Sequence, residues 1–397
     1  MKKIIVILLS LFLVLGLAAC AGDAPAPPPE APAPDAPAPD APAPDATADD
    51  PAEDPPEAAT GLIGIIFPET ITPRWPGDAD HFRAAFEDSP FDEIHILFSE
   101  GSVDIERRNV ETLVALGADV IVLCAVDGSA AASAAEFARS EGAVLISYDR
   151  LIMDTDAVNF HITNCAILTG ELMANHLVRN VTGTGNPLYI YAGHPADNNA
   201  FLLVEGSWNI LQPLIADGTF VIVNSSEAIA LQDYPELTRE QISRIVNQVA
   251  TNWSPSDARD LAEAHLTAAS DDLKGDVFIL APNDGTALGM AEAFHADPAI
   301  TSFFITGQDS EVANIQAILD GRLTMTSFRD TRENVRATMN LANQVFLGQT
   351  PTTDGYFFNN LVYVPSILLP MHEVTAETAW VLLIDSGFYT EDMFDWP

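Results

Sequence analysis

Short apolar runs that alternate with helical patterns constrain the fold of this chain more than any other feature. The runs are 61–67, 93–98, 119–126, 143–148, 187–193, 220–224, 276–282 and 302–307, and the helical patterns are 106–116, 129–141, 198–215, 256–269, 285–296 and 310–320. Strands that are apolar on both faces and separated by helices are typical of parallel sheets with helical crossovers. The sequence therefore predicts an α/β fold built from doubly wound parallel sheets.

The part of the chain that shows this rhythm is too long for one comfortable core and suits two. The rhythm lapses near residues 155–165 and then restarts. We predict that 61–162 with 330–359 form an N-terminal lobe, and that 163–329 with 360–397 form a C-terminal lobe. Ligands of open α/β sheets bind at the carboxyl ends of the strands, so a cleft between the lobes is the expected site.

The first 60 residues predict export and tethering. Residues 1–20 read MKKIIVILLSLFLVLGLAAC, with lysines before a short apolar run and small residues after it, as in a signal peptide. The ending resembles a bacterial lipobox, so we expect Cys20 to be lipidated and the mature protein to be held on the outer face of the bacterial cell membrane or in the periplasm. Residues 21–60 are rich in Pro, Ala and Asp, which favours an extended, disordered stalk.

The formal net charge of −40 excludes two classes of ligand. A strongly acidic surface is repelled by nucleic acid and by anionic lipid, so neither is an expected partner. A solvated acidic face that aids solubility accounts for most of this charge.

Polar side chains and one tryptophan follow six of these apolar runs and the later segment LTMTSF (323–328). They are Arg74, Trp75, Asp127, Asp149, Arg150, Asp197, Asn198, Asn199, Asn283, Asp284, Gln308, Asp309 and Arg329. Such groups suit a neutral ligand covered with hydroxyls, because carboxylates accept the hydroxyl proton while Arg and Asn donate. Capping of the following helix is the alternative role of Asp197 and Asp284. For the adjacent Asp149 and Arg150, the alternative is a mutual ion pair.

Eight short motifs occur in a fixed order along the chain: PRW, VDG, SYDRL, DNNA, NWSP, PNDG, TGQD and SFRDTRE. In order and approximate spacing they resemble the periplasmic sugar-binding proteins of ABC transporters, and they are most similar to the xylose and multiple-monosaccharide receptor group. The likeness runs from Gly61 to the closing IDSGFYTEDMF. It implies a type I binding protein, a monomer without metal or cofactor, whose two lobes close on one monosaccharide and deliver it to permease subunits. We expect the hinge near 162–165, 327–330 and 359–364.

The resemblance also implies which side chains contact the sugar. Asp149 and Arg150 match a first-lobe pair that bonds hydroxyls, and Trp75 matches a position that stacks on the sugar ring. Arg329 stands where the family places Lys, Asn or Gln, and its planar guanidinium leaves open whether a sugar acid is accepted. For Trp253, core packing is the alternative to a second stacking wall. The implied ligand-binding residues are Arg74, Trp75, Asp127, Asp149, Arg150, Asn198, Asn199, Trp253, Asp284 and Arg329.

No catalytic constellation stands out, so we predict a binding protein and not an enzyme. The sequence has no HExxH, GxSxG or paired CxxC motif, and its eight histidines are scattered. The GTG at 183–185 precedes an apolar run instead of following one, unlike a dinucleotide-binding turn. Cys124 and Cys165 lie in or beside apolar runs, where we expect buried free thiols.

Three other binding functions are alternatives to sugar uptake. A DNA-binding repressor is disfavoured by the signal peptide, the acidic surface and the lack of a helix-turn-helix segment before Gly61. A sugar receptor for a chemoreceptor or sensor kinase remains an alternative, because such partners also recognise closed lobes. Binding of a nucleoside or a signalling furanose is the other alternative.

Overall fold

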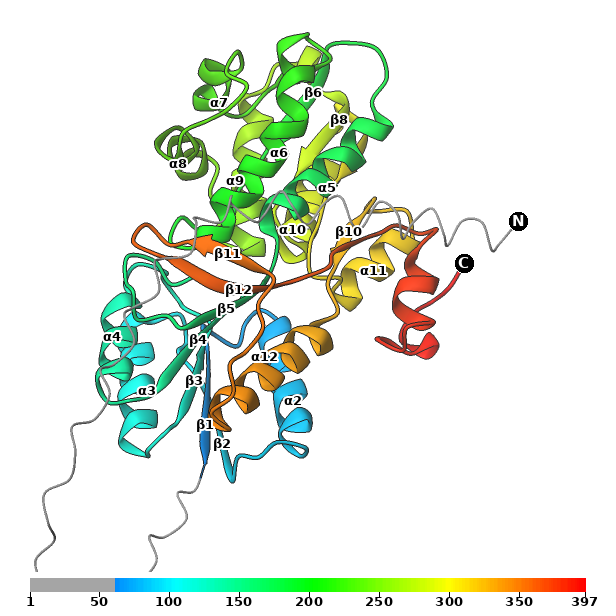
Figure 1. Ribbon diagram of the computed structural model, residues 1–397. Coiled ribbons are helices and arrows are strands. Elements are labelled where there is room, and N and C mark those ends of the chain that lie inside the picture. The colour runs from blue at the N-terminus through cyan, green and yellow to red at the C-terminus, as the bar shows by residue number, and fades with distance from the viewer. Residues whose placement is uncertain (1–60) are drawn as a thin grey trace, which may run out of the picture.

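The computed structural model describes residues 61–397, which fold into two α/β lobes (Figure 1). The predicted signal peptide, lipidation site and stalk lie outside the described residues. Between residues 61 and 397, no helix is both long enough and apolar enough to cross a membrane.

A seven-stranded sheet forms the centre of the first lobe, with strand order β11-β12-β5-β4-β3-β1-β2. All neighbouring strands are parallel except β11 and β12. The strands are β1 (Leu62–Phe67), β2 (Glu93–Phe98), β3 (Val120–Leu123), β4 (Val144–Tyr148), β5 (Phe160–Asn164), β11 (Gly355–Phe358) and β12 (Tyr363–Leu369). The helices are α2 (Arg74–Phe86), α3 (Val103–Ala115), α4 (Ala132–Ser140) and α12 (Thr331–Phe346).

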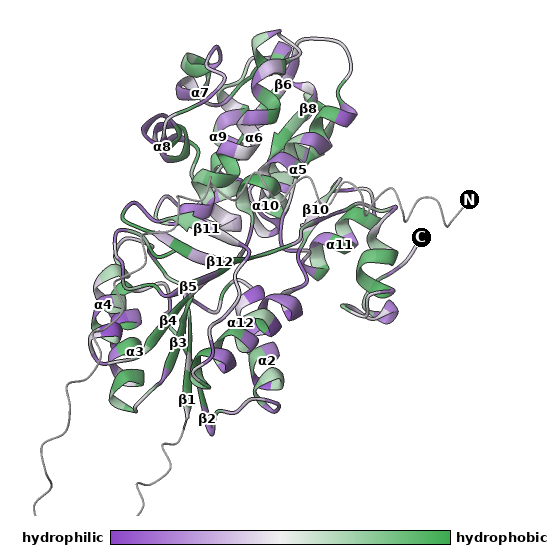
Figure 2. Ribbon diagram, viewed as in Figure 1, coloured by the Kyte–Doolittle hydropathy of each residue, from purple (hydrophilic) through white to green (hydrophobic). Residues whose placement is uncertain are grey.

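The apolar runs of this lobe are continuous because both faces of the sheet are covered. In β1, Ile63 and Phe67 pack into the cluster formed with α2 and α12, whereas Leu62 and Ile66 pack into the cluster formed with α3 and α4. All six residues of β1 are buried. In Figure 2 the central strands β3 and β4 are mainly hydrophobic, while the helices that cover the sheet carry both hydrophobic and hydrophilic residues.

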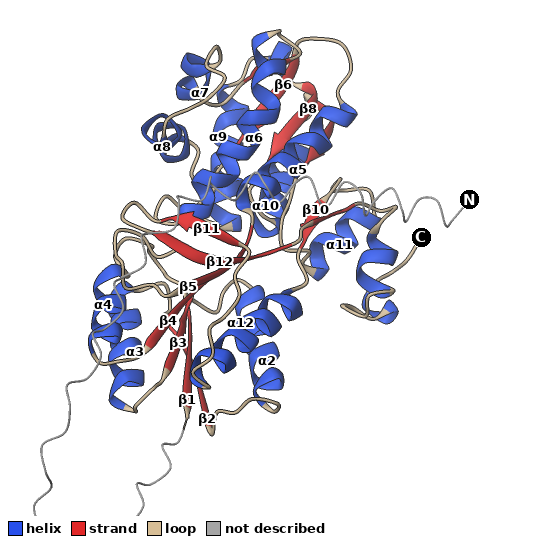
Figure 3. Cartoon of the chain, viewed as in Figure 1, coloured by secondary structure: helices blue, strands red, loops and turns tan. Residues whose placement is uncertain are grey.

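A four-stranded parallel sheet of order β7-β6-β8-β9 forms the second lobe. Its strands are β6 (Asn186–Ile190), β7 (Phe220–Ile222), β8 (Gly275–Leu280) and β9 (Ile300–Ile305), and a separate antiparallel pair is made by β10 (Thr326–Phe328) and β13 (His372–Val374). Its helices are α5 (Ala166–Asn180), α6 (Asn198–Ala216), α7 (Ser226–Leu231), α8 (Arg239–Gln248), α9 (Pro255–Ala268), α10 (Asp284–Ala296) and α11 (Val312–Leu319). Short helical turns occur at Asp271–Leu273, Trp380–Ile384 and Glu391–Met393. Helices cover both faces of this sheet, as in the first lobe (Figure 3).

The chain crosses between the lobes three times: from β5 to α5, from β10 to α12 and from β12 to β13. The first two crossings lie where the sequence predicted a hinge. The third was expected near 359–364, and that expectation is wrong, because β12 pairs with β5 in the first-lobe sheet. Residues 360–369 therefore do not belong to the C-terminal lobe as predicted. Pro365 and Ser366 interrupt the apolar residues of β12, and Pro is uncommon inside a sheet, so the segment does not read as a continuous apolar run.

The predicted fold class is confirmed, because two lobes with parallel sheets and helical crossovers are present. Each of the eight apolar runs overlaps a strand. The Cys124 thiol is buried and free, as expected. Cys165 is also buried, and its Sγ accepts a hydrogen bond from the N–H of Leu168 at 3.5 Å.

Candidate functional site

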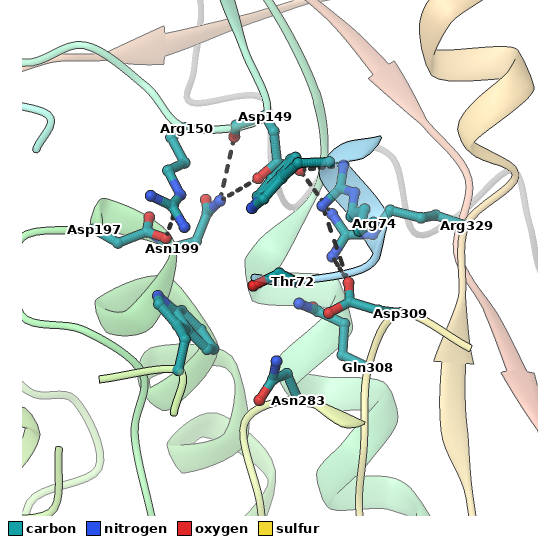
Figure 4. Close-up of a pocket in the computed structure, with 12 residues that line it drawn as sticks. Thr72, Arg74, Asp149, Arg150, Asp197, Asn199, Asn283, Gln308, Asp309 and Arg329 are labelled. Atoms are coloured by element: carbon teal, nitrogen blue, oxygen red, sulfur yellow. Dashed lines mark hydrogen bonds and ion pairs between the residues drawn. The ribbon is translucent and has the colours of Figure 1, made fainter. Parts of the chain in front are cut away.

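A cavity with about 390 Å³ of empty space lies at the junction of the two lobes (Figure 4). Its lining side chains come from segments that follow strands of both lobes, and from the crossing after β10. They are Thr72, Arg74, Trp75, Asp149, Arg150, Asp197, Asn199, Trp253, Asn283, Gln308, Asp309 and Arg329. The carboxyl ends of parallel strands thus face one another across the cleft, as the general rule for α/β sheets predicts.

Backbone strain concentrates around this cavity. Asp149, directly after β4, has φ +61°. It is the central residue of a three-residue turn, in which the N–H of Arg150 donates to the carbonyl oxygen of Tyr148 at 2.7 Å. This three-residue turn is rare and strained, although Asp tolerates the left-handed region better than most residues do. Trp253 (φ +59°) and Asp309 (φ +105°) are also left-handed and also line the cavity. Such strain tends to persist at ligand sites, where the surrounding structure fixes it.

Asp149 is the centre of an ion-pair network. Its Oδ2 lies 2.8 Å from Arg74 Nη2 and 2.8 Å from Arg329 Nη1. Arg329 Nη2 also lies 2.8 Å from Asp309 Oδ1, so its guanidinium joins a residue after β4 to a residue after β9. Burial alone would raise the pKa of Asp149, but the guanidinium groups of Arg74, Arg329 and Arg150 outweigh it and lower the pKa to about 2. Asp149 is therefore ionised at neutral pH.

Arg150 pairs with the opposite lobe instead of with its neighbour. Its Nε lies 3.0 Å from Asp197 Oδ2. Asp197 also caps α6, because its Oδ1 accepts a hydrogen bond from the N–H of Asn199 at 2.9 Å. The side chain of Asn199 donates to the backbone oxygen of Asp149 at 3.2 Å. The alternative of an ion pair between Asp149 and Arg150 is therefore not realised, and Asp197 both caps the helix and bridges the lobes.

Two tryptophans line the cavity from opposite lobes. The guanidinium carbons of Arg74 and Arg150 lie 4.6 and 5.5 Å from the centre of the Trp75 ring, which favours cation–π attraction. Trp253 packs against Gly193, where even a Cβ would come within 2.1 Å of its ring. Only glycine allows this approach. Trp253 also packs against the second-lobe core, so its core-packing role and its place in the cavity coexist.

Three residues of the predicted set do not line the cavity. Asp127 accepts hydrogen bonds from two backbone N–H groups of the following turn. Instead of the cavity, it lines a separate and larger pocket. Asn198 is buried in the first turn of α6. Asp284 is fully buried and accepts from the N–H of Glu311 at 2.8 Å. Burial, reinforced by the Glu311 charge, raises the pKa of Asp284 well above its usual range. Its suggested cap role is wrong, because Asn283 caps α10.

Five lining residues are absent from the ligand-binding set that the family resemblance implies. Asp197, Asn283, Gln308 and Asp309 follow apolar runs, so the strand-end rule had already marked them. Thr72 lies in the loop after β1 and carries no signal of its own. Within the described chain from Gly61 onward, no group of three or more His, Cys, Asp or Glu side chains could hold a metal ion.

Comparison with known proteins places this geometry in a family. Residues 63–350 match the periplasmic binding protein domain family. The chain belongs to the periplasmic binding proteins. This binding protein is 27% identical to the multiple sugar-binding periplasmic protein of Azospirillum brasilense, over 84% of this chain and 90% of that protein. It is 28% identical to the D-xylose-binding periplasmic protein of Escherichia coli, over 83% of this chain and 91% of that one.

A solved structure is more similar still. A carbohydrate transporter solute-binding protein from Chloroflexus aurantiacus, in complex with D-glucose, is 48% identical with a TM-score of 0.83, covering 85% of this chain and 99% of that one. The resemblance to sugar-binding proteins of ABC transporters is thus confirmed. So is the prediction of a binding protein instead of an enzyme, because the family consists of binding proteins.

Proposed function

We propose that this binding protein captures one neutral monosaccharide of the glucose or xylose type by closure of its lobes, and delivers it to the permease of an ABC importer while anchored to the membrane through Cys20. The observation that carries the proposal is the cavity of alternating guanidinium and carboxylate groups between the lobes. The D-glucose complex of the Chloroflexus relative and the xylose receptor of Escherichia coli support the sugar class.

The charge of the cavity favours a neutral ligand. Three arginines (Arg74, Arg150 and Arg329) face three aspartates (Asp149, Asp197 and Asp309), so the formal charges cancel. A sugar hydroxyl donates to a carboxylate and accepts from a guanidinium or amide, and each such bond contributes about 1.5–3 kcal/mol when buried. A uronic acid would add one negative charge to a balanced set, and we expect it to bind more weakly.

Closure follows from the division of these groups between the lobes. A sugar that contacts Asp149 on one side and Asn199 on the other gains its full set of hydrogen bonds only when the lobes are together. Its preference for that arrangement shifts the equilibrium toward the closed form. The permease would then recognise the closed outline.

Titration calorimetry tests the sugar assignment. The panel contains D-glucose, D-xylose, D-galactose, D-glucuronate, uridine and a free furanose. We expect tight binding of at least one neutral aldopyranose and weaker binding of the uronate. Heat from the nucleoside or the furanose alone would overturn the assignment.

The membrane anchor and the role in uptake need separate measurements. Intact mass of the membrane-extracted protein should show acyl chains, and Cys20→Ser should release the protein from the membrane fraction. Retention of Cys20→Ser in that fraction would refute the lipid anchor. Neighbouring genes for a permease and an ATPase would support uptake, whereas a sensor kinase alone would support sensing.

A further inference from the structure

A second cavity, with about 630 Å³ of empty space, lies where the three crossings between the lobes meet. Asn164 comes from the first crossing, Phe328 and Asp330 from the second, and Leu369 from the third, while Leu382 covers it from the C-terminal segment. None of its lining residues is shared with the cavity described above. We refer to it as the hinge cavity.

The hinge cavity lies on the opposite side of the crossing from the proposed sugar. Arg329 points into the sugar cavity, whereas its two neighbours, Phe328 and Asp330, line the hinge cavity. Adjacent residues of an extended segment point in opposite directions, so one short segment serves both cavities. Any change in the separation of the lobes must therefore change the hinge cavity as well.

A buried acceptor in this cavity lacks a donor. Asn334, on α12, is fully buried, and its Nδ2 donates to Asn164 Oδ1 at 2.7 Å. Its own Oδ1 has no hydrogen-bond partner among the residues that the structure describes. Leaving such an oxygen unsatisfied costs about 1–3 kcal/mol, and buried polar atoms are rarely left so. A ligand that donates a hydrogen bond would satisfy it.

The remaining walls define the chemistry of that ligand. Phe328, Leu369 and Leu382 offer apolar surface, and the carboxylates of Asp330 and Glu333 contribute negative charge. Each of these carboxylates pairs with an arginine of α12, but among residues 61–397 no Lys or Arg lines the cavity. The hydrogen-bond acceptor, the two carboxylates and the apolar side chains together favour a small cation that also carries an apolar group.

We propose that the hinge cavity is a second ligand site, which takes a small organic ammonium ion whose N–H groups donate to Asn334 Oδ1. The occupant also couples to the sugar site. The lobes are held together at the front by contacts such as Arg150 with Asp197. Opening the front moves the walls of the hinge cavity toward each other, so an occupant resists opening and raises sugar affinity. By thermodynamic linkage the sugar raises the affinity of the ammonium ion by the same factor.

Benzylammonium is a suitable probe, with benzyl alcohol and benzoate as neutral and anionic controls. Calorimetry on the complete protein without sugar should show saturable binding of benzylammonium that exceeds binding of both controls. No binding of benzylammonium, or equal binding of all three compounds, would overturn the site. This titration needs no sugar, so its failure is distinct from failure of the proposed function.

A variant that fills the cavity locates the site. Leu382→Trp should weaken benzylammonium binding at least tenfold, a loss of about 1.4 kcal/mol. The matched control is Leu347→Trp, at an exposed position after the end of α12. Equal binding by wild type and Leu382→Trp would place the probe elsewhere and refute the proposal, provided that circular dichroism shows Leu382→Trp to be folded. If Leu382→Trp is not folded, a nuclear Overhauser measurement on the wild-type protein replaces the variant. It should show a contact between benzylammonium and Phe328, and a missing contact would refute the site.

The coupling is tested with the sugar that binds best, and this step alone rests on the proposed function. Saturating benzylammonium should raise sugar affinity roughly fivefold or more, the lower range of typical allosteric coupling. An unchanged or lowered sugar affinity, with benzylammonium bound, would refute the coupling.

Discussion

Asp149→Asn separates the electrostatic role of this residue from its backbone role. Asn keeps the size of the side chain and, like Asp, tolerates the left-handed φ of +61°. The change removes the carboxylate that lies 2.8 Å from both Arg74 and Arg329. A shift of the Asp149 pKa from 3.8 to about 2 corresponds to about 2 kcal/mol of stability. Because the folded pKa is lowered, this stability is complete above about pH 4 and is lost as the pH falls toward 2.

Two assays report the two consequences. Urea unfolding near neutral pH should show a loss of about 2 kcal/mol for Asp149→Asn, and the difference from wild type should shrink at about pH 3. Calorimetry should show sugar affinity roughly 10- to 100-fold weaker, since a buried charged acceptor is lost.

The control is Asp154→Asn, an exposed aspartate of the same lobe with φ +60°. An equal stability loss in Asp154→Asn would show that the loss does not depend on the buried ion-pair network. Unchanged sugar affinity in Asp149→Asn would refute its role as a ligand.

The other predictions concern three further acids. Asp197→Asn keeps the cap of α6 but removes the ion pair with Arg150, so calorimetry should show sugar affinity roughly tenfold weaker, with little change in thermal stability. Asp284→Asn should leave sugar affinity nearly unchanged in the same assay, because this side chain does not line the cavity; a large loss would restore it as a ligand. Burial raises the pKa of Glu106 to about 7, so its ionisation destabilises the fold as the pH rises from about 4.5 to 7. Glu106→Gln should therefore stabilise the protein by about 3 kcal/mol near pH 8 but not near pH 4 in urea unfolding, whereas the exposed Glu111→Gln should not.

The sequence predicted the strands whose residues form continuous apolar runs and missed those whose apolar residues are interrupted. A strand such as β1 must be apolar throughout, because α2 and α3 pack on its two sides. In β12, Pro365 and Ser366 interrupt the apolar residues, and β5 carries His161 and Thr163 in its buried interior. Neither segment stands out as an apolar run, and both lie at the junction of the lobes (Figure 3). The domain boundary was misplaced for that reason.

The candidate site was predictable in its chemistry but not in its partners. The rule that ligands bind at the carboxyl ends of strands identified Asp149 and Arg150 from the sequence alone. It could not reveal that Asp149 bonds Arg74 and Arg329, because these partners are distant in sequence and one comes from the other side of a crossing. Nor could it separate Asn283 from Asp284, adjacent residues of which only Asn283 faces the cavity. At the N-terminus of a helix, adjacent residues point their side chains in different directions, and the sequence does not show which of the two faces the cavity.

The distribution of charge gives the cavity a selectivity that no single contact supplies. The chain has 57 acidic and only 17 basic residues, yet three of the arginines gather in one cavity. The cavity is therefore balanced in charge while the rest of the surface is strongly negative. An anionic sugar derivative is repelled at long range by that surface and then meets a cavity without spare positive charge. A neutral sugar meets neither obstacle, so selection against charge begins before the ligand reaches Asp149. Raising the ionic strength should screen only the long-range part. If a uronate then associates faster but still binds weakly, both the long-range repulsion by the surface and the lack of spare positive charge in the cavity select against it.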